Sequence, residues 1–86
     1  MSGSPVEQLL SQQLGIQIAR RRVEKNLSQE ALADLVGIST NHLQLLESGL
    51  SDRKKRTPAN PRLSTLVALS DALDVSLPDL LRQSLS

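Results

Sequence analysis

The stretch from residue 28 to residue 48 constrains the fold more than any other part of the chain. Ser28 and Ser39 stand where a serine hydroxyl can cap the start of a helix, and Gly37 supplies the left-handed residue that ends one. These signals predict two short helices joined by a tight turn. Ala33 lies in the middle of the first helix, where two steeply crossing backbones require a small side chain.

The apolar residues of the same stretch are spaced to face one shared core. They are Leu32, Val36, Ile38, Leu43 and Leu46. Leu43 and Leu46 are three positions apart and therefore share one face of the second helix, which is predicted from Thr40 to about Ser48. The opposite face then presents a mainly polar set to solvent: Thr40, Asn41 and Gln44, with Leu45 and Ser48 beside them.

Helical periodicity also runs through the N-terminal part of the chain, where a helix is predicted from about residue 5 to residue 25. Its apolar residues recur every four positions: Val6, Leu10, Leu14 and Ile18. A capping-box pattern marks its start: Ser4, Pro5 and Glu7. Gly15 predicts a bend or an interruption in this helix, and Asn26 marks its end.

Residues 50–61 break the helical pattern. They hold two prolines, small polar residues and the basic run from Arg53 to Arg56, so they are predicted to form an irregular loop. Beyond them, apolar residues at helical spacing predict a fourth helix from about Leu63 and a fifth that opens at Ser76 and Leu77. The chain is therefore predicted to be all-α, with five helices and no strand.

Composition narrows the classes of function. The chain has no Phe, Tyr or Trp, which removes aromatic stacking on unpaired bases and argues against a single-stranded nucleic acid as the target. It has no cysteine, which excludes disulfides, thiolate zinc sites and thiol catalysis. No apolar run approaches the roughly 20 residues that span a bilayer. We expect no membrane contact and a cytoplasmic location at the nucleoid.

Charge is concentrated in the middle of the chain. Residues 20–62 carry nine of the ten basic residues and five of the nine acidic ones. This asymmetry favours one surface that faces a polyanion. A helix whose outward face carries amide side chains can enter the major groove of B-DNA, where such amides suit adenine and threonine suits thymine. The residues predicted to read base edges of double-stranded DNA are Thr40, Asn41, Gln44 and Leu45.

This part of the chain resembles the Cro and phage-repressor type of helix-turn-helix transcriptional regulators, also called xenobiotic-response-element-like. Five segments carry the resemblance: residues 27–33, residues 36–39, Leu43, residues 46–49 and residues 66–76. It covers about residues 14–82. It implies a compact five-helix bundle of the lambda-repressor-like DNA-binding class. Residues 1–86 would form a single domain, with an N-terminal helical extension at about 5–13 and a basic inserted loop at about 50–61.

The sequence departs from the family pattern at three places. Leu45 stands at an outward position where the family often carries a polar or basic residue, which favours apolar contact with thymine methyl groups. Arg21 stands where an apolar residue is common, which leaves the packing of the first helix open. The connection after Gly49 is longer than usual and basic.

Two further sets of site residues are predicted. By resemblance, Arg22 and Glu47 form a partly buried ion pair between the first and third helices; the alternative is that both are ordinary surface charges. Phosphate contacts are expected from residues around the third helix and in the basic run: Gln29, Ser39, His42, Ser48, Arg53, Lys54, Lys55 and Arg56. For the basic run, the alternative is a solvated charge run without a partner.

The predicted function is sequence-specific binding of double-stranded DNA by a homodimer on a palindromic operator, with helix 40–48 in the major groove. Two surfaces offer a dimer contact: residues 5–13, or the fifth helix with Leu77, Leu81 and Leu85. The alternative is a protein-interaction module or antitoxin-like partner on the same scaffold, which the outward Leu45 favours. We expect that the chain is not an enzyme, that the isolated His42 holds no metal and that no cofactor binds, because no catalytic or metal-ligand pattern is present.

Overall fold

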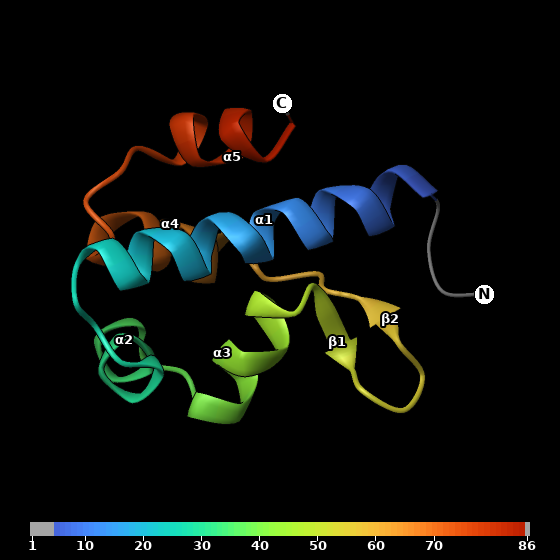
Figure 1. The fold of residues 1–86 in the computed structure, drawn as a ribbon, viewed down its shortest axis with the longest axis horizontal. Coiled ribbons are helices and arrows are strands. Elements are labelled where there is room, and N and C mark those ends of the chain that lie inside the picture. The colour runs from blue at the N-terminus through green and yellow to red at the C-terminus, as the bar shows by residue number, and fades with distance from the viewer. Residues whose placement is uncertain (1–4, 86) are drawn as a thin grey trace.

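The computed structural model describes residues 5–85, and that part of the chain folds into five α-helices and a short antiparallel β-hairpin (Figure 1). In chain order the elements are α1 (Pro5–Glu24), α2 (Gln29–Val36), α3 (Thr40–Glu47), β1 (Leu50–Asp52), β2 (Thr57–Pro58), α4 (Leu63–Ala72) and α5 (Leu77–Leu85). The long helix α1 lies between α5 on one side and α3 with the hairpin on the other (Figure 1). The predicted five-helix architecture is confirmed.

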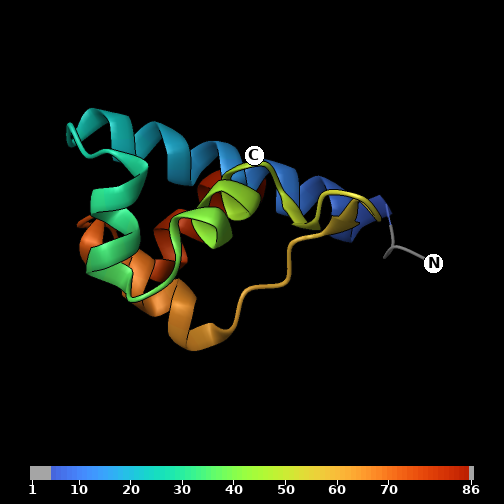
Figure 2. The same cartoon turned by 90° about the horizontal axis from the view of Figure 1, so that it is seen from below.

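The two short helices and their turn form as the local signals predict. The Ser28 hydroxyl accepts a hydrogen bond from the Ala31 amide, and the Ser39 hydroxyl accepts one from the His42 amide, both at 3.0 Å. Gly37 ends α2 with a φ of 82°, which costs a glycine little. Viewed from below, α3 lies between α2 and the hairpin (Figure 2).

One apolar core joins all five helices. Each helix contributes one aliphatic side chain with no exposed surface: Ile18, Leu32, Leu43, Leu69 and Leu80. Burying a side chain of this size stabilises a fold by about 1.5–3 kcal/mol relative to exposing it. Because these five side chains belong to one cluster, α3 is fixed against the rest of the protein through Leu43 and Leu46.

Gly15 has a different role from the predicted one. The helix α1 is continuous from Pro5 to Glu24, so the expected interruption at Gly15 is wrong. A Cβ atom at this position would lie 2.5 Å from the carbonyl oxygen of Leu46 and 2.6 Å from that of Glu47. Glycine is therefore required for the close approach of α1 to the end of α3, rather than to interrupt the helix.

The expectation of an irregular loop over residues 50–61 is also wrong in part. Strands β1 and β2 pair antiparallel in this segment, with Leu50 opposite Pro58 and Asp52 opposite Thr57. The buried Ser11 hydroxyl on α1 donates to the Ala59 carbonyl at 2.8 Å, and so ties the hairpin to α1. This contact is non-local, since 48 positions separate the two residues along the chain.

Two apolar residues at helical spacing are exposed rather than buried, Leu35 on α2 and Val6 on α1. The side chain of Leu35 is 63% exposed, although its spacing matches that of the apolar face of α2, because α2 packs on α3 and α4 through its other side. Val6 at the start of α1 is 73% exposed. Asn26 ends the α1 segment with a φ of 58°, as predicted. The predicted capping serine, Ser4, lies outside the described residues.

Candidate nucleic-acid interface

The outward face of α3 carries the four side chains that sequence reasoning assigns to base reading. Asn41 is exposed, and Thr40, Gln44 and Leu45 are half-buried. The helix can present this face because the Ser39 cap and the buried Leu43 fix both its start and its roll angle. Polar amides on a helix held this rigidly can make directional hydrogen bonds to an external partner.

The hairpin extends the same surface. An open hollow next to α3 is lined by residues of both elements: Asn41, Leu45, Ser51, Asp52, Arg53 and Lys54. The hairpin and α3 lie side by side in two orthogonal views (Figures 1 and 2). The structure thus brings three of the predicted base-reading residues, Asn41, Gln44 and Leu45, to one place with the start of the basic run.

Arg22 and Glu47 meet between α1 and α3. The Arg22 guanidinium donates to both carboxylate oxygens of Glu47, with Nε at 2.7 Å and Nη2 at 3.2 Å, and it also donates to the Leu27 carbonyl at 2.8 Å. The two side chains are 15% and 8% exposed. A two-pronged bond of this kind fixes direction as well as distance. It holds the last turn of α3 against α1.

This ion pair continues as a chain of hydrogen bonds across the surface. The Gln29 amide donates to Glu47 at 3.0 Å, the Gln44 amide donates to Gln29 at 3.3 Å, and Arg53 Nη2 donates to Gln44 Oε1 at 3.2 Å. We call these five hydrogen-bonded residues the polar relay; in order they are Arg22, Glu47, Gln29, Gln44 and Arg53. Sequence reasoning singled out each of its members but predicted no contact beyond the Arg22–Glu47 pair.

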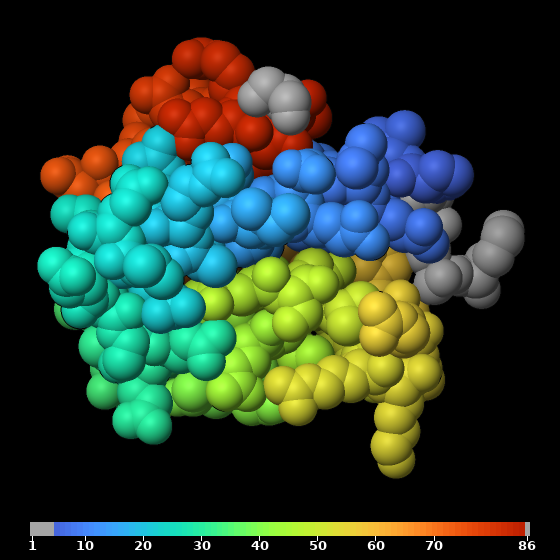
Figure 3. Space-filling model, in the orientation of Figure 1, coloured from blue at the N-terminus to red at the C-terminus, as the bar shows by residue number. Residues whose placement is uncertain are grey.

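The basic run occupies the turn between the strands, where all four of its residues are exposed. Asp52 shapes this turn by accepting hydrogen bonds from the amides of Lys54 at 2.8 Å and Lys55 at 3.0 Å. The amide of Lys55 and, less strongly, that of Lys54 lower the pKa of Asp52 below its ordinary value of 3.8. In the space-filling view the hairpin, in yellow, forms the corner beside α3, and a side chain projects from it into solvent (Figure 3).

The other predicted phosphate contacts lie around α3. Gln29 begins α2, and its side chain is already bonded to Glu47 and Gln44. The Ser39 hydroxyl caps α3, and the Ser48 hydroxyl donates to the Gln44 carbonyl at 2.9 Å. His42 is exposed on the side of α3 that faces the connection from β2 to α4.

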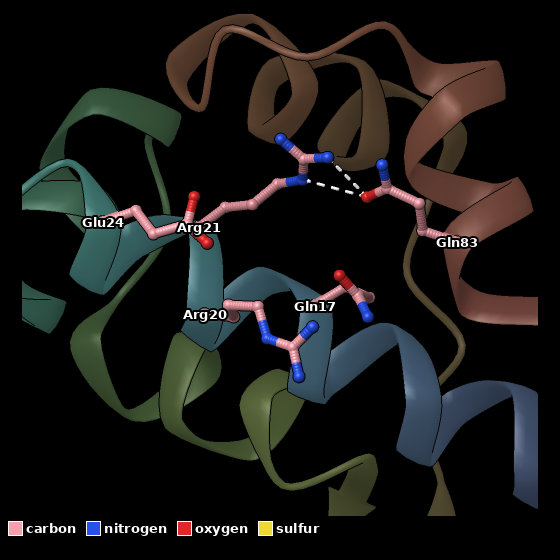
Figure 4. Close-up of a pocket in the computed structure, with 5 residues that line it drawn as sticks. All are labelled: Gln17, Arg20, Arg21, Glu24 and Gln83. Carbon is pink, nitrogen blue, oxygen red and sulfur yellow. Dashed lines mark hydrogen bonds between the residues drawn. The ribbon is translucent and has the colours of Figure 1, made fainter.

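Arg20 and Arg21 lie on another side of the molecule, in a polar groove between α1 and α5 that is also lined by Gln17, Glu24 and Gln83 (Figure 4). Arg21 Nε donates to Gln83 Oε1 at 3.2 Å, and its Nη2 donates to the same oxygen. Arg20 instead extends alongside Gln17 (Figure 4). The polar residue at position 21 is thus accommodated by a polar partner on α5.

Within residues 5–85, no group of three or more His, Cys, Asp and Glu side chains is arranged to hold a metal ion. In the same part of the chain, no helix is long and apolar enough to cross a membrane. The same residues include no buried side-chain nitrogen or oxygen without a hydrogen-bond partner.

Comparison with known proteins places this geometry in context. A family model described as helix-turn-helix matches residues 18–80. Control protein C.SmaI from Serratia marcescens is 44% identical over 61 residues, which are 70% of this chain and 63% of that protein. This chain therefore spans less than two thirds of the length of that relative.

Two solved structures share both the fold and part of the sequence. The restriction-modification controller protein C.AhdI from Aeromonas hydrophila is 29% identical with a TM-score of 0.65, covering 80% of this chain and 92% of that one. SinR, a master regulator for biofilm formation solved in complex with DNA, is 31% identical with a TM-score of 0.64, covering 79% of this chain and 97% of that one.

Proposed function

Because the chain belongs to the helix-turn-helix family of Cro and phage-repressor type, a family of DNA-binding regulators and not of enzymes, we propose that it regulates transcription by binding double-stranded DNA. One observation carries the proposal: the outward amides of α3 and the basic turn of the hairpin share one surface. A major groove about 12 Å wide admits a helix presented in this way, and the flanking phosphates attract the basic turn.

In the proposed complex, α3 lies in the major groove with its N-terminal half toward the bases. Asn41 and Gln44 supply amides that match the N6 and N7 edge of adenine. Thr40 contacts a base edge by hydrogen bond or methyl group, and Leu45 packs on a thymine methyl. Each well-formed amide contact contributes about 1–3 kcal/mol of discrimination against the wrong base.

Phosphate contacts position the protein on the duplex. Lys54, Lys55 and Arg56 are exposed in the hairpin turn, and together with Arg53 they fit the backbone on one side of the groove. On the other side, the first amides of α2 at Gln29 attract a phosphate through the partial positive charge of the helix N-terminus. Three further contacts complete the proposed set: Ser39, His42 and Ser48.

We also propose that two copies bind together on a palindromic operator. A single helix reads too few base pairs for a useful specificity, whereas a two-fold dimer doubles the contacts. Exposed apolar side chains are available on both candidate faces, with Val6 and Leu9 on α1 and Leu85 on α5. The described residues would then act as one DNA-binding domain, in which the N-terminal turns of α1 and the basic hairpin are additions to the five-helix core. The site of action would be DNA in the cytoplasm.

Selection from a pool of random duplexes, followed by sequencing, tests this function. We expect an inverted repeat whose half-sites are about one helical turn apart, roughly 34–36 Å. Affinity for the selected duplex should fall steeply with salt, because binding releases counterions from the phosphates. Analytical ultracentrifugation of the complex should give two chains per duplex.

Substitutions assign the selected motif to α3. The double variant Asn41→Ala with Gln44→Ala should lose at least about tenfold in affinity for the motif, and Gln17→Ala is the matched control because it removes an amide from the α1–α5 groove. If no motif is enriched and only weak, salt-sensitive binding remains, the proposal is wrong and a protein-interaction module on this scaffold becomes the better interpretation.

A further inference from the structure

The donor and acceptor capacity of each group fixes the direction of the polar relay. Both oxygens of the Glu47 carboxylate are acceptors and the group has no donor, so Gln29 must turn its NH2 group toward it. The Gln29 carbonyl oxygen is then left to face Gln44, which must turn its own NH2 group toward Gln29. The Gln44 carbonyl oxygen consequently points away from Gln29, toward the hairpin.

Arg53 closes the relay at its other end. A guanidinium carries only donors, and its Nη2 lies 3.2 Å from the Gln44 carbonyl oxygen. Two charged groups, Glu47 and Arg53, therefore impose the same orientation on the Gln44 amide from opposite ends. Gln44 keeps one N–H and one oxygen lone pair, which is the combination that a bidentate contact with a base edge requires.

We propose that Arg53 is a specificity-determining residue, which positions the Gln44 amide and acts with it as one base-reading unit. This inference rests on the proposed function, since it assumes that α3 reads bases. It predicts that the inserted hairpin contributes to the choice of sequence and not only to affinity. The bond to Gln44 uses one of five N–H groups of Arg53, so the others remain available to DNA.

The hydrogen bond to Gln44 sets Arg53 apart within the basic run. Together with Lys54, Arg53 lines the hollow that Asn41 and Leu45 also line, next to the outward face of α3. Its backbone follows directly on Asp52, whose carboxylate holds the turn through the next two amides. Lys55 is equally exposed but lies further round the turn, and it is not among the residues that line this hollow.

The test measures selectivity, defined as the ratio of the dissociation constants for a scrambled duplex and for the duplex selected by the wild-type protein. We expect Arg53→Ala and Gln44→Ala each to lower selectivity by about tenfold, and the double variant to lower it little further, because the two side chains act as a unit. The matched control Lys55→Ala removes an equal charge from the same turn and should weaken both duplexes alike.

Arg53→Lys separates positioning from charge. It keeps the positive charge, so the dependence of affinity on salt should stay that of the wild-type protein. Selectivity should stay as low as in Arg53→Ala, because the flexible lysine stem does not hold its ammonium at the position of Nη2. Renewed selection with Arg53→Ala should enrich a motif that differs at the position read by Gln44.

The outcomes separate this inference from the function on which it rests. If the wild-type protein enriches a motif, but Arg53→Ala weakens both duplexes equally or adds independently to Gln44→Ala, Arg53 is a phosphate contact and the inference alone fails. If Arg53→Lys restores full selectivity, positioning by the guanidinium is likewise refuted. If the wild-type protein enriches no motif, both the proposed function and this inference fail.

Discussion

The α2–α3 pair and the β-hairpin lie side by side on one surface, yet different interactions hold them in shape. Serine caps, a glycine turn and buried leucines define the helices within 21 consecutive residues, 28 to 48. The hairpin has strands of only three and two residues, and it depends on Ser11 of the distant helix α1 and on the Asp52 turn. The helices are thus locally determined, whereas the hairpin is shaped largely by what it contacts.

The polar relay crosses from one region to the other and changes character on the way. At the Arg22–Glu47 end both side chains are nearly buried, so the loss of either partner would leave a buried charge uncompensated. At the Arg53 end the bond is exposed to solvent, and water competes with it in the absence of DNA. One continuous set of bonds therefore links the packing of α1 against α3 to the surface that we propose to bind DNA.

Removing the cation from each end of the relay should separate stability from function. Arg22→Ala leaves the Glu47 carboxylate nearly buried without its cation, which we expect to cost about 3 kcal/mol of unfolding free energy. Arg53→Ala should change that free energy by less than about 0.5 kcal/mol, because the side chain is exposed. Urea denaturation followed by far-ultraviolet circular dichroism measures both, since the chain lacks Tyr and Trp. Equal losses of unfolding free energy in the two variants would show that the buried and the exposed end of the relay contribute equally to stability.

The same contrast explains which parts of the fold the sequence predicts. Ser28, Ser39 and Gly37 act on backbone groups within a few positions of themselves, so their roles can be inferred from spacing alone. The other three helices, α1, α4 and α5, are predicted from apolar residues at helical spacing. Leu35 shows the limit of periodicity, because spacing identifies an apolar face but not whether another helix covers all of it.

The candidate site was predicted residue by residue, but its connections were not. The amides of Gln29 and Gln44 are visible in the sequence, whereas their contact depends on the angle at which α2 meets α3. The hairpin could not be inferred because its strands are too short to show alternation and its anchor, Ser11, lies 48 positions from Ala59. Nothing near Gly15 in the sequence reveals that the backbone of α3 passes against it.

A substitution at the anchor should affect the hairpin and spare the helices. Ser11→Ala leaves the carbonyl of the buried Ala59 without its donor. We expect this to lower the free energy of opening the hairpin by about 1–2 kcal/mol. Hydrogen exchange measured by NMR should accelerate at the Ala59 amide, which donates to Gly49 at 2.9 Å. Exchange at the Leu43 amide in α3 should change little. Ser48→Ala, which removes an exposed hydroxyl, is the matched control, and equal acceleration at both amides in Ser11→Ala would contradict a locally anchored hairpin.

The smallest expected effect is a local change in the hairpin turn as the pH is lowered and Asp52 takes up a proton. The Lys55 amide, with a smaller part from the Lys54 amide, holds the pKa of Asp52 below its ordinary value of 3.8. Because the folded pKa is the lower one, the ionised carboxylate stabilises the turn above the unfolded pKa, and this contribution is lost as pH falls through the folded pKa. The carbon-13 shift of the Asp52 carboxyl should therefore titrate with a midpoint below 3.8, and the Lys54 and Lys55 amide shifts should follow it.

Asp52→Asn should abolish that transition in the two lysine amides and leave α3 unchanged, since the groups that cap α2 and α3 are serine hydroxyls, which do not titrate in this range. An Asp52 midpoint at or above 3.8 would mean that the turn is not held by its carboxylate in solution. In that case the hairpin would owe its position to its packing against α1 and α3, and Arg53 would lose the fixed backbone from which it reaches Gln44.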